Sequence, residues 1–172
     1  MEFWKYIDRF NARTVVKLGG LTRAFMRLLP LRPADDGGEI PFARLAKPLA
    51  ECTVALVTSC GVHLQSQERF NMEARGGDPT YREFLWDEIT AGYVVSHSHF
   101  DSRDIMKDLN VAIPGDRIEE LAARGVVGAL HPVVYSFMGY IPRSRPLVRR
   151  YAPEVADGLA RAKVDIAILT PC

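Results

Sequence analysis

The feature that most constrains the fold is a short apolar run near the end of the sequence. Residues 164–170 are rich in β-branched side chains and are followed by Pro171 and Cys172. Such a run is typical of a strand buried on both faces of a parallel sheet, which a crossover helix normally follows. We therefore expect an α/β fold with a cysteine at the carboxyl edge of the sheet, where open α/β sheets bind ligands.

The rest of the sequence predicts an α/β domain preceded by helices. Further strands or extended segments are expected at 53–58, 81–86, 93–96, 110–113 and 126–130. Helices are expected at 114–124 and 153–163, each with proline in its first turn, and the polar residues 65–80 predict a long loop. We predict amphipathic helices and a linker over 1–41. Residues 42–172 are expected to form a Rossmann-like or flavodoxin-like domain, with a mostly parallel sheet of about four strands.

Composition narrows the classes of function. The chain has 172 residues, of which 48% are hydrophobic and 25% charged, as in a soluble globular protein. The formal net charge of +1 predicts no nucleic-acid partner. We find no apolar stretch of the roughly 20 residues that a spanning helix needs, and no signal peptide. Three cysteines suit a reducing compartment. We predict a cytoplasmic protein with no membrane partner.

The first group of candidate site residues follows the run at 53–58 and consists of Thr58, Ser59, Cys60, Gly61 and His63. Gly61 permits a tight turn, and small hydroxyl side chains at a strand end suit hydrogen bonds to a carboxylate or phosphate. Two interpretations stay open. One is a substrate-binding turn with His63 as an acid or base and Cys60 as a thiol. The other is a strand–loop corner in which Cys60 is a small buried hydrophobe.

The second group is His97, His99 and Asp101 in the segment SHSHFD. Two histidines two residues apart on an extended segment point the same way, and an acid close by completes a metal site or orients an imidazole. The segment is similar to the start of the metallo-β-lactamase metal motif, but Ser102 stands where that family has a histidine. A metal-dependent hydrolase, with His63 or His131 as a further ligand, is thus one alternative. A hydrogen-bonded corner is the other.

The third group lies in the aromatic run at 131–141, which holds Tyr135 and Ser136. Its composition favours a packed loop that lines the core. The run is followed by four arginines, Arg143, Arg145, Arg149 and Arg150. Their guanidinium groups could bind an acidic group through two hydrogen bonds at once.

Taken in order, the segments TSCGVH, SHSHFD, DLNVAIP, YSFMGYI and ILTP resemble the selenoprotein B family of glycine, sarcosine and betaine reductases, which includes the related D-proline reductase subunit. The resemblance covers roughly residues 42–172. The common form of the first motif in that family has glycine where this chain has Cys60.

The resemblance implies a subunit of a reductase that cleaves a carbon–heteroatom bond of a small amino or carboxylic acid. A selenolate or thiolate would be the nucleophile, because the anion is the reactive form. The implied partners are a small carboxylate-bearing substrate, a thiol or thioredoxin-like reductant, and a second copy or a partner reductase subunit. The residues expected around the substrate are Thr58, Ser59, Cys60, Gly61, Tyr135 and Ser136. The residues expected to be catalytic are Cys172, His97, His99, Asp101 and His63. No metal is expected.

The family carries its selenocysteine at about the position where this sequence stops. Selenocysteine is encoded by UGA, which is commonly read as a stop codon. We therefore expect a UGA codon after Cys172, a reading frame that continues with a covering helix, and a selenocysteine in the longer protein. Cys172 would then serve as a resolving thiol. The alternatives are a truncation and a true terminus closed by a partner chain, in which case the chain is a non-catalytic binding subunit. A UAA or UAG codon directly after the codon of Cys172 would exclude a selenocysteine at that position.

Overall fold

The structure is a computed structural model that describes residues 43–97 and 101–171. The helices expected before residue 42 lie outside the described residues, and so do His99 and Cys172. The chain divides into two compact units, Met1–Ala46 and Lys47–Cys172. Within the described parts of the chain, no helix combines the length and the apolar character needed to cross a membrane.

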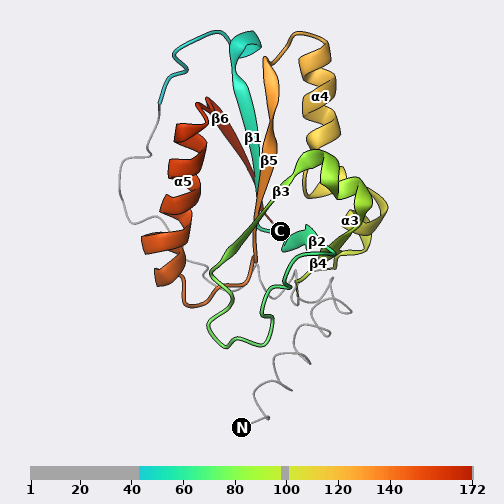
Figure 1. Cartoon of the computed structure of the whole chain (residues 1–172), viewed down its shortest axis with the longest axis vertical. Coiled ribbons are helices and arrows are strands. Elements are labelled where there is room, and N and C mark those ends of the chain that lie inside the picture. Colours follow the sequence, from blue (N-terminus) through green and yellow to red (C-terminus); the bar gives the residue numbers. More distant parts are fainter. Residues whose placement is uncertain (1–42, 98–100, 172) are drawn as a thin grey trace, which may run out of the picture. The chain divides into compact units, whose positions relative to one another are not determined.

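A four-stranded sheet is the centre of the second unit (Figure 1). Its strands follow the order β3-β5-β1-β6, with bounds β3 (Tyr81–Leu85), β5 (Ala129–Phe137), β1 (Thr53–Thr58) and β6 (Ile166–Thr170). Strand β1 pairs in parallel with β5 and with β6, whereas β3 is antiparallel to β5. The predicted α/β class and mostly parallel sheet are therefore confirmed.

Helices lie on both faces of this sheet (Figure 1). On one side is α5 (Ala152–Arg161), which follows a single π-turn at η4 (Leu147–Tyr151) and buries Val155. On the other side is α4 (Gly115–Ala123), which buries Ile118. Both helices were predicted with proline in the first turn, and α4 also from its apolar face; both form within two residues of the expected bounds.

The main core lies between the sheet and α4. Alternate residues of a strand face opposite sides, and the buried core cluster takes Val54 and Leu56 from β1, Val134 from β5 and Ile118 from α4. Residues 55 and 57 of β1 therefore face α5. Shorter elements on the α4 side close the core, and their bounds are α3 (Arg103–Lys107), η2 (Trp86–Ala91) and η3 (Leu109–Val111). A further turn, η1 (Leu49–Glu51), precedes β1.

A second, two-stranded sheet stands beside the first and consists of β2 (Val62–Leu64) and β4 (Tyr93–Val95), which are antiparallel. The strand expected at 93–96 therefore forms, but it pairs with β2 and not within the four-stranded sheet. As a result, His97 follows the small sheet and not the four-stranded one.

Three local expectations were wrong. The run at 110–113 begins as a 3-10 turn, because Asp108 caps it by accepting a hydrogen bond from Asn110 N and Pro114 follows. Ala112 and Ile113 are buried without pairing, whereas Val111 is exposed. The aromatic run continues strand β5 as far as Phe137 and is not a loop there. Strand β6 is an edge strand and is not buried on both faces, since the Leu169 side chain is 71% exposed.

Candidate active site at the carboxyl edge of the sheet

Three hydroxyl side chains stand in a row where the parallel strands end. Thr58 of β1 is paired with Ser136 of β5 on one side and with Thr170 of β6 on the other. Paired residues of neighbouring strands point to the same face of a sheet. Thr58 is 2% exposed and Ser136 is completely buried. The carboxyl edge of this sheet thus carries polar groups inside the molecule, at the place where α/β proteins bind ligands.

The three hydroxyls differ in how their hydrogen bonds are satisfied. Thr58 Oγ1 donates to the Thr170 carbonyl oxygen at 3.3 Å and accepts from Cys60 N at 3.2 Å. Thr170 Oγ1 donates to the Ala112 carbonyl oxygen at 2.5 Å. Ser136 Oγ has no hydrogen-bond partner among the described residues. A buried hydroxyl that lacks a partner is costly, so Ser136 is the member of the row whose hydrogen-bonding capacity is left unsatisfied.

This difference gives a paired prediction for stability. Ser136→Ala removes a buried hydroxyl without a partner, so we expect the free energy of unfolding to stay within about 0.5 kcal/mol or to rise. Thr58→Ala removes a hydroxyl that makes two hydrogen bonds and a buried methyl group, so we expect a loss of roughly 1–3 kcal/mol. Urea denaturation of both variants measures the difference. A loss of more than 1 kcal/mol in Ser136→Ala would show that its hydroxyl is already satisfied.

The turn after β1 joins the two sheets. Cys60, which is fully buried, makes an isolated bridge with Met138. Gly61 N donates to the Phe137 carbonyl oxygen at 2.9 Å, and the Gly61 carbonyl accepts from Ser96 N at 2.8 Å. The backbone at Gly61 has φ +67°, a conformation that favours glycine. The predicted role of Gly61 in a tight turn agrees with this geometry.

The same corner brings His97 close to Ser59. A Cβ atom added to Gly139 would lie 2.5 Å from His97 Nε2 and 2.8 Å from the Ser59 carbonyl oxygen, so both groups rest against the Gly139 backbone. The structure therefore gathers Ser59 and His97 at one end of β1, beside Cys60. Sequence reasoning gave no role to Gly139, although this glycine lies inside the aromatic run at 131–141.

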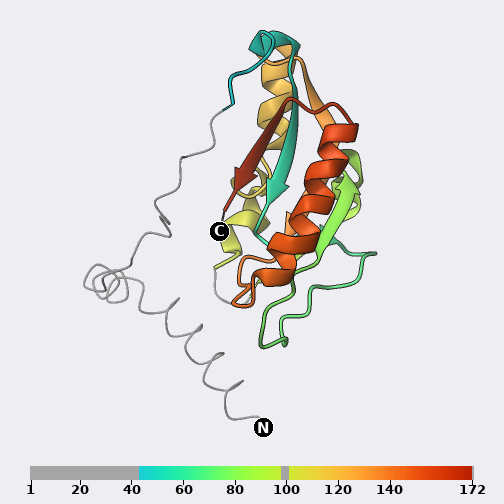
Figure 2. The same cartoon turned by 90° about the vertical axis from the view of Figure 1, so that its left-hand side faces the viewer.

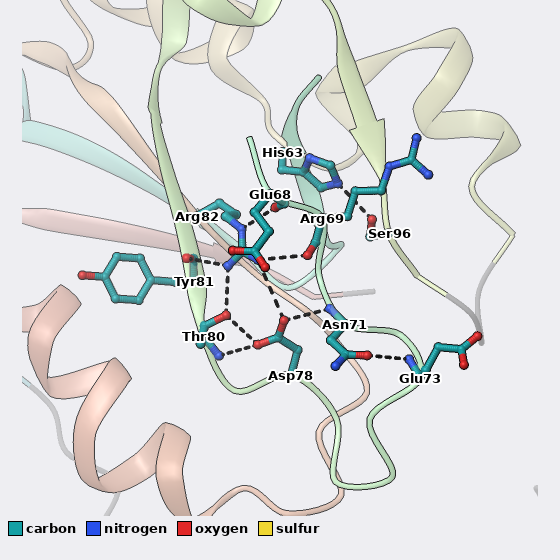
Figure 3. Close-up of polar contacts among 10 residues, drawn as sticks. All are labelled: His63, Glu68, Arg69, Asn71, Glu73, Asp78, Thr80, Tyr81, Arg82 and Ser96. Atoms are coloured by element: carbon teal, nitrogen blue, oxygen red, sulfur yellow. Dashed lines mark hydrogen bonds and ion pairs between the residues drawn. The ribbon is translucent and has the colours of Figure 1, made fainter. Parts of the chain in front are cut away.

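His63 lies in the small sheet with both ring nitrogens engaged, and Figure 3 shows the contact with Ser96. Its Nδ1 is 2.8 Å from the Leu64 carbonyl oxygen, which can only accept, so Nδ1 carries the proton. Nε2 is 2.9 Å from Ser96 Oγ and accepts from that hydroxyl. Burial lowers the pKa of His63, so the neutral ring is favoured. This arrangement ties β2 to the end of β4, and a catalytic role for His63 stays a prediction.

The long loop at 65–80 is fastened to β3 by a network that the sequence did not predict (Figure 3). Arg82 donates from Nε to the Glu68 carbonyl oxygen at 2.7 Å, and its guanidinium lies 4.4 Å from the centre of the Phe70 ring. Burial alone would raise the pKa of Asp78, but hydrogen bonds from Thr80 and Asn71 outweigh it and the pKa is lowered. The loop beside the small sheet is thus held by exposed and partly buried polar contacts.

Two other predicted residues make contacts outside the turn that follows β1. Asp101 accepts hydrogen bonds of 2.9 Å from Arg103 Nε, and this contact lowers the pKa of the carboxyl group, which favours the anion over a proton donor. Tyr135 faces α5, where its hydroxyl lies close to Gly158, and the neighbouring Ser136 points to the opposite face. The predicted roles of Asp101 and Tyr135 remain untested.

A metal site is not assembled from the described residues. Within residues 43–97 and 101–171, no three histidine, cysteine or acidic side chains are grouped so as to hold a metal ion. His99, which the hydrolase alternative requires, lies outside that part of the chain. Elemental analysis of protein purified without chelator discriminates the alternatives: stoichiometric zinc, iron or manganese that is lost in His97→Gln would favour the hydrolase.

Comparison with known proteins gives one consistent family. Residues 22–172 match the family described as Glycine/sarcosine/betaine reductase selenoprotein B (GRDB). The D-proline reductase subunit gamma of Acetoanaerobium sticklandii is 36% identical over 126 residues, which are 73% of this chain and 51% of the relative. The glycine reductase complex component B subunit gamma of Symbiobacterium thermophilum is 31% identical over 141 residues, covering 80% of this chain and 32% of the relative.

A third relative, the betaine reductase complex component B subunit beta of Peptoclostridium acidaminophilum, is 29% identical over 156 residues, covering 90% of this chain and 34% of the relative. The chain thus spans between about a third and about a half of the length of these curated relatives. No solved structure matches the chain.

Proposed function

Because the chain belongs to the glycine/sarcosine/betaine reductase selenoprotein B family, we propose that it is a subunit of a reductase that cleaves a carbon–heteroatom bond of a small amino or carboxylic acid. The observation that carries the proposal is the family match over residues 22–172, which includes the whole carboxyl edge described above. The named relatives are subunits of D-proline, glycine and betaine reductases, so we propose a substrate of the same chemical class.

The geometry supports a binding site for a carboxylate at this edge. Ser136 offers a buried hydroxyl that no described residue satisfies, and a carboxylate oxygen accepts a hydrogen bond from such a donor. Thr58, Ser59 and Gly61 form the turn beside it and would complete the pocket with Cys60. Tyr135 remains a predicted contact, and its position on the α5 face makes it the weakest member of the group.

The reaction needs a nucleophile and a proton. A selenolate or thiolate supplies the nucleophile, with Cys172 as the residue of this chain that we predict to take part. The nucleophile forms a bond to the carbon α to the carboxylate, and the bond from that carbon to the leaving group breaks. The leaving group departs with the electron pair of the broken bond and takes up a proton. His97 and His99 are our candidate proton donors, since histidine titrates near neutral pH. A dithiol would then cleave the thioether or selenoether: the substrate carbon leaves with one proton as the reduced acid, the nucleophile is released with the other, and the dithiol becomes a disulfide.

The proposal extends to the fold type and the setting. We propose that the sheet belongs to the Rossmann-like or flavodoxin-like class, for which the parallel β5-β1-β6 pairing and the helices on both faces are the support. We also propose a cytoplasmic setting, a thiol or thioredoxin-like reductant, and association with a second copy or another reductase subunit. The names of the relatives as components of complexes support the last point.

Histidine substitutions test the proposed chemistry. In an active full-length preparation with its partner subunits, we expect His99→Gln to lower the turnover number about 100-fold and to change KM by less than threefold, because it removes a proton donor and not a binding group. His97→Gln should act in the same direction. The measurement is the steady-state consumption of D-proline, glycine or betaine with dithiothreitol as the reductant.

His131→Gln is the matched control for this experiment. His131 lies in β5, several residues before Ser136 at the carboxyl edge, and is half-buried. Its replacement should leave turnover within twofold of the unmodified enzyme. Unchanged turnover in His99→Gln would remove that residue from the mechanism, and failure to consume any of the three substrates would contradict the proposed substrate class.

A further inference from the structure

The two edge strands of the sheet, β3 and β6, differ in how far they are covered by other residues and in whether they carry charged side chains. At the β3 edge, the side chain of Gln67 donates from Nε2 to the Glu83 carbonyl oxygen at 2.7 Å. Charged residues Arg82 and Glu83 stand in this strand, and the loop at 65–80 lies along it. Charges and covering groups on an edge strand prevent pairing with another chain. The β3 edge is therefore protected.

The β6 edge has no comparable protection in the described part of the chain. Its sequence is Ile-Ala-Ile-Leu-Thr, without charge or proline, and among the described strands it is paired with β1 alone. The Thr170 carbonyl accepts from Ser59 N at 3.0 Å, so the peptide groups of residue 170 face β1. Because these groups alternate along a strand, those of Ala167 and Leu169 face outward.

One face of β6 is also uncovered. Ile166 and Ile168 pack on the core, which places Ala167 and Leu169 on the face that carries α5. Helix α5 nevertheless packs elsewhere on that face, since its Gly158 lies against Tyr135 of β5. Figure 2 looks onto this face and shows β6 to one side of the helix. The Leu169 side chain is accordingly 71% exposed.

We propose that β6 is a docking edge for one further strand, whose polypeptide also covers Leu169 and which corresponds to the part of the relatives that this chain does not match. The match covers 51% of the D-proline reductase subunit gamma, so about half of that relative has no counterpart here. An open, uncharged edge beside an exposed leucine is the pattern that pairs with an added strand. The occupant is the polypeptide that corresponds to this unmatched part, and the proposal rests on the family and not on the proposed chemistry.

Amide hydrogen exchange tests the docking edge directly. In the 172-residue chain alone, we expect Ala167 and Leu169 amides to exchange at least tenfold faster than those of Ile168 and Thr170, which face β1. The probe is the unmatched half of the Acetoanaerobium sticklandii D-proline reductase subunit gamma, expressed as a separate polypeptide. Its addition should slow exchange at Ala167 and Leu169 at least tenfold and leave Ile168 unchanged. These readouts are independent of turnover.

Substitutions separate edge pairing from general surface effects. Leu169→Lys should weaken binding of the probe at least tenfold, and Leu169→Pro should do the same because it removes an outward-facing N–H. Val111→Lys, at an exposed residue of η3, is the matched control and should leave binding unchanged. Slow exchange at Ala167 and Leu169 in the isolated monomer would overturn the proposal. So would no protection by the probe, or protection that depends only on the concentration of this chain, which would identify a second copy as the occupant.

Discussion

Replacing Gly61 with alanine is expected to lower the free energy of unfolding by roughly 2–5 kcal/mol. Two effects add. The residue has φ +67°, which disfavours any side chain with a Cβ atom. In addition, the new Cβ would overlap the Ser96 carbonyl oxygen and lie 3.0 Å from the Ser96 carbonyl carbon, and backbone atoms have little room to move. The hydrogen bond between Ser96 N and the Gly61 carbonyl, which ties β4 to the turn, would be strained.

Gly125 supplies the control that separates these two effects. It has φ +68°, nearly the same as Gly61, but an added Cβ would meet no heavy atom within 4 Å. Gly125→Ala should therefore lose only the conformational part, about 1–2 kcal/mol. Urea denaturation of both variants measures the difference. Equal losses would mean that the close approach of Gly61 to Ser96 contributes nothing to stability.

Local sequence patterns were sufficient to predict the strands and helices that a short apolar run or a helix-starting proline marks. Strand β1, predicted from its apolar run, and helices α4 and α5, predicted with proline in the first turn, appear in the structure at nearly the expected bounds. Strand β5 was only partly predicted, because Pro132 and the aromatic residues favour a loop by composition, while pairing with both β1 and β3 makes the segment extended. Strand pairing of this kind joins residues that are far apart in the sequence, so a short stretch of sequence does not reveal it.

The candidate site was predictable to the extent that it sits at strand ends. Thr58, Ser59 and Gly61 follow a recognisable strand, and parallel pairing brings Ser136 beside Thr58. The role of Gly139 was not predictable, because the sequence does not show that the His97 ring lies on its backbone. The Arg82 network was missed for the same reason, since its acceptors are main-chain carbonyls of a loop that carries no periodic signal.

Strand β6 shows that an apolar run does not by itself predict burial. Two leucine substitutions, one in β1 and one in β6, measure the difference in burial between these strands. Leu56 of β1 is 2% exposed and belongs to the core cluster, so Leu56→Ala should lower the free energy of unfolding by about 2–5 kcal/mol through lost burial and a residual cavity. Leu169 lies in the adjacent strand, next to the partner of Leu56, Ile168. It is exposed, so Leu169→Ala should change stability by no more than about 0.5 kcal/mol.

The two substitutions delete the same atoms from neighbouring strands, so the difference between them reports only how each side chain is covered. Thermal and urea unfolding of the 172-residue chain give that difference directly. A loss above about 1.5 kcal/mol in Leu169→Ala would mean that Leu169 is covered in the isolated chain. If the two losses diverge as expected, β6 has an apolar face that contributes little to the stability of this chain. That face is then available to the polypeptide that docks on it.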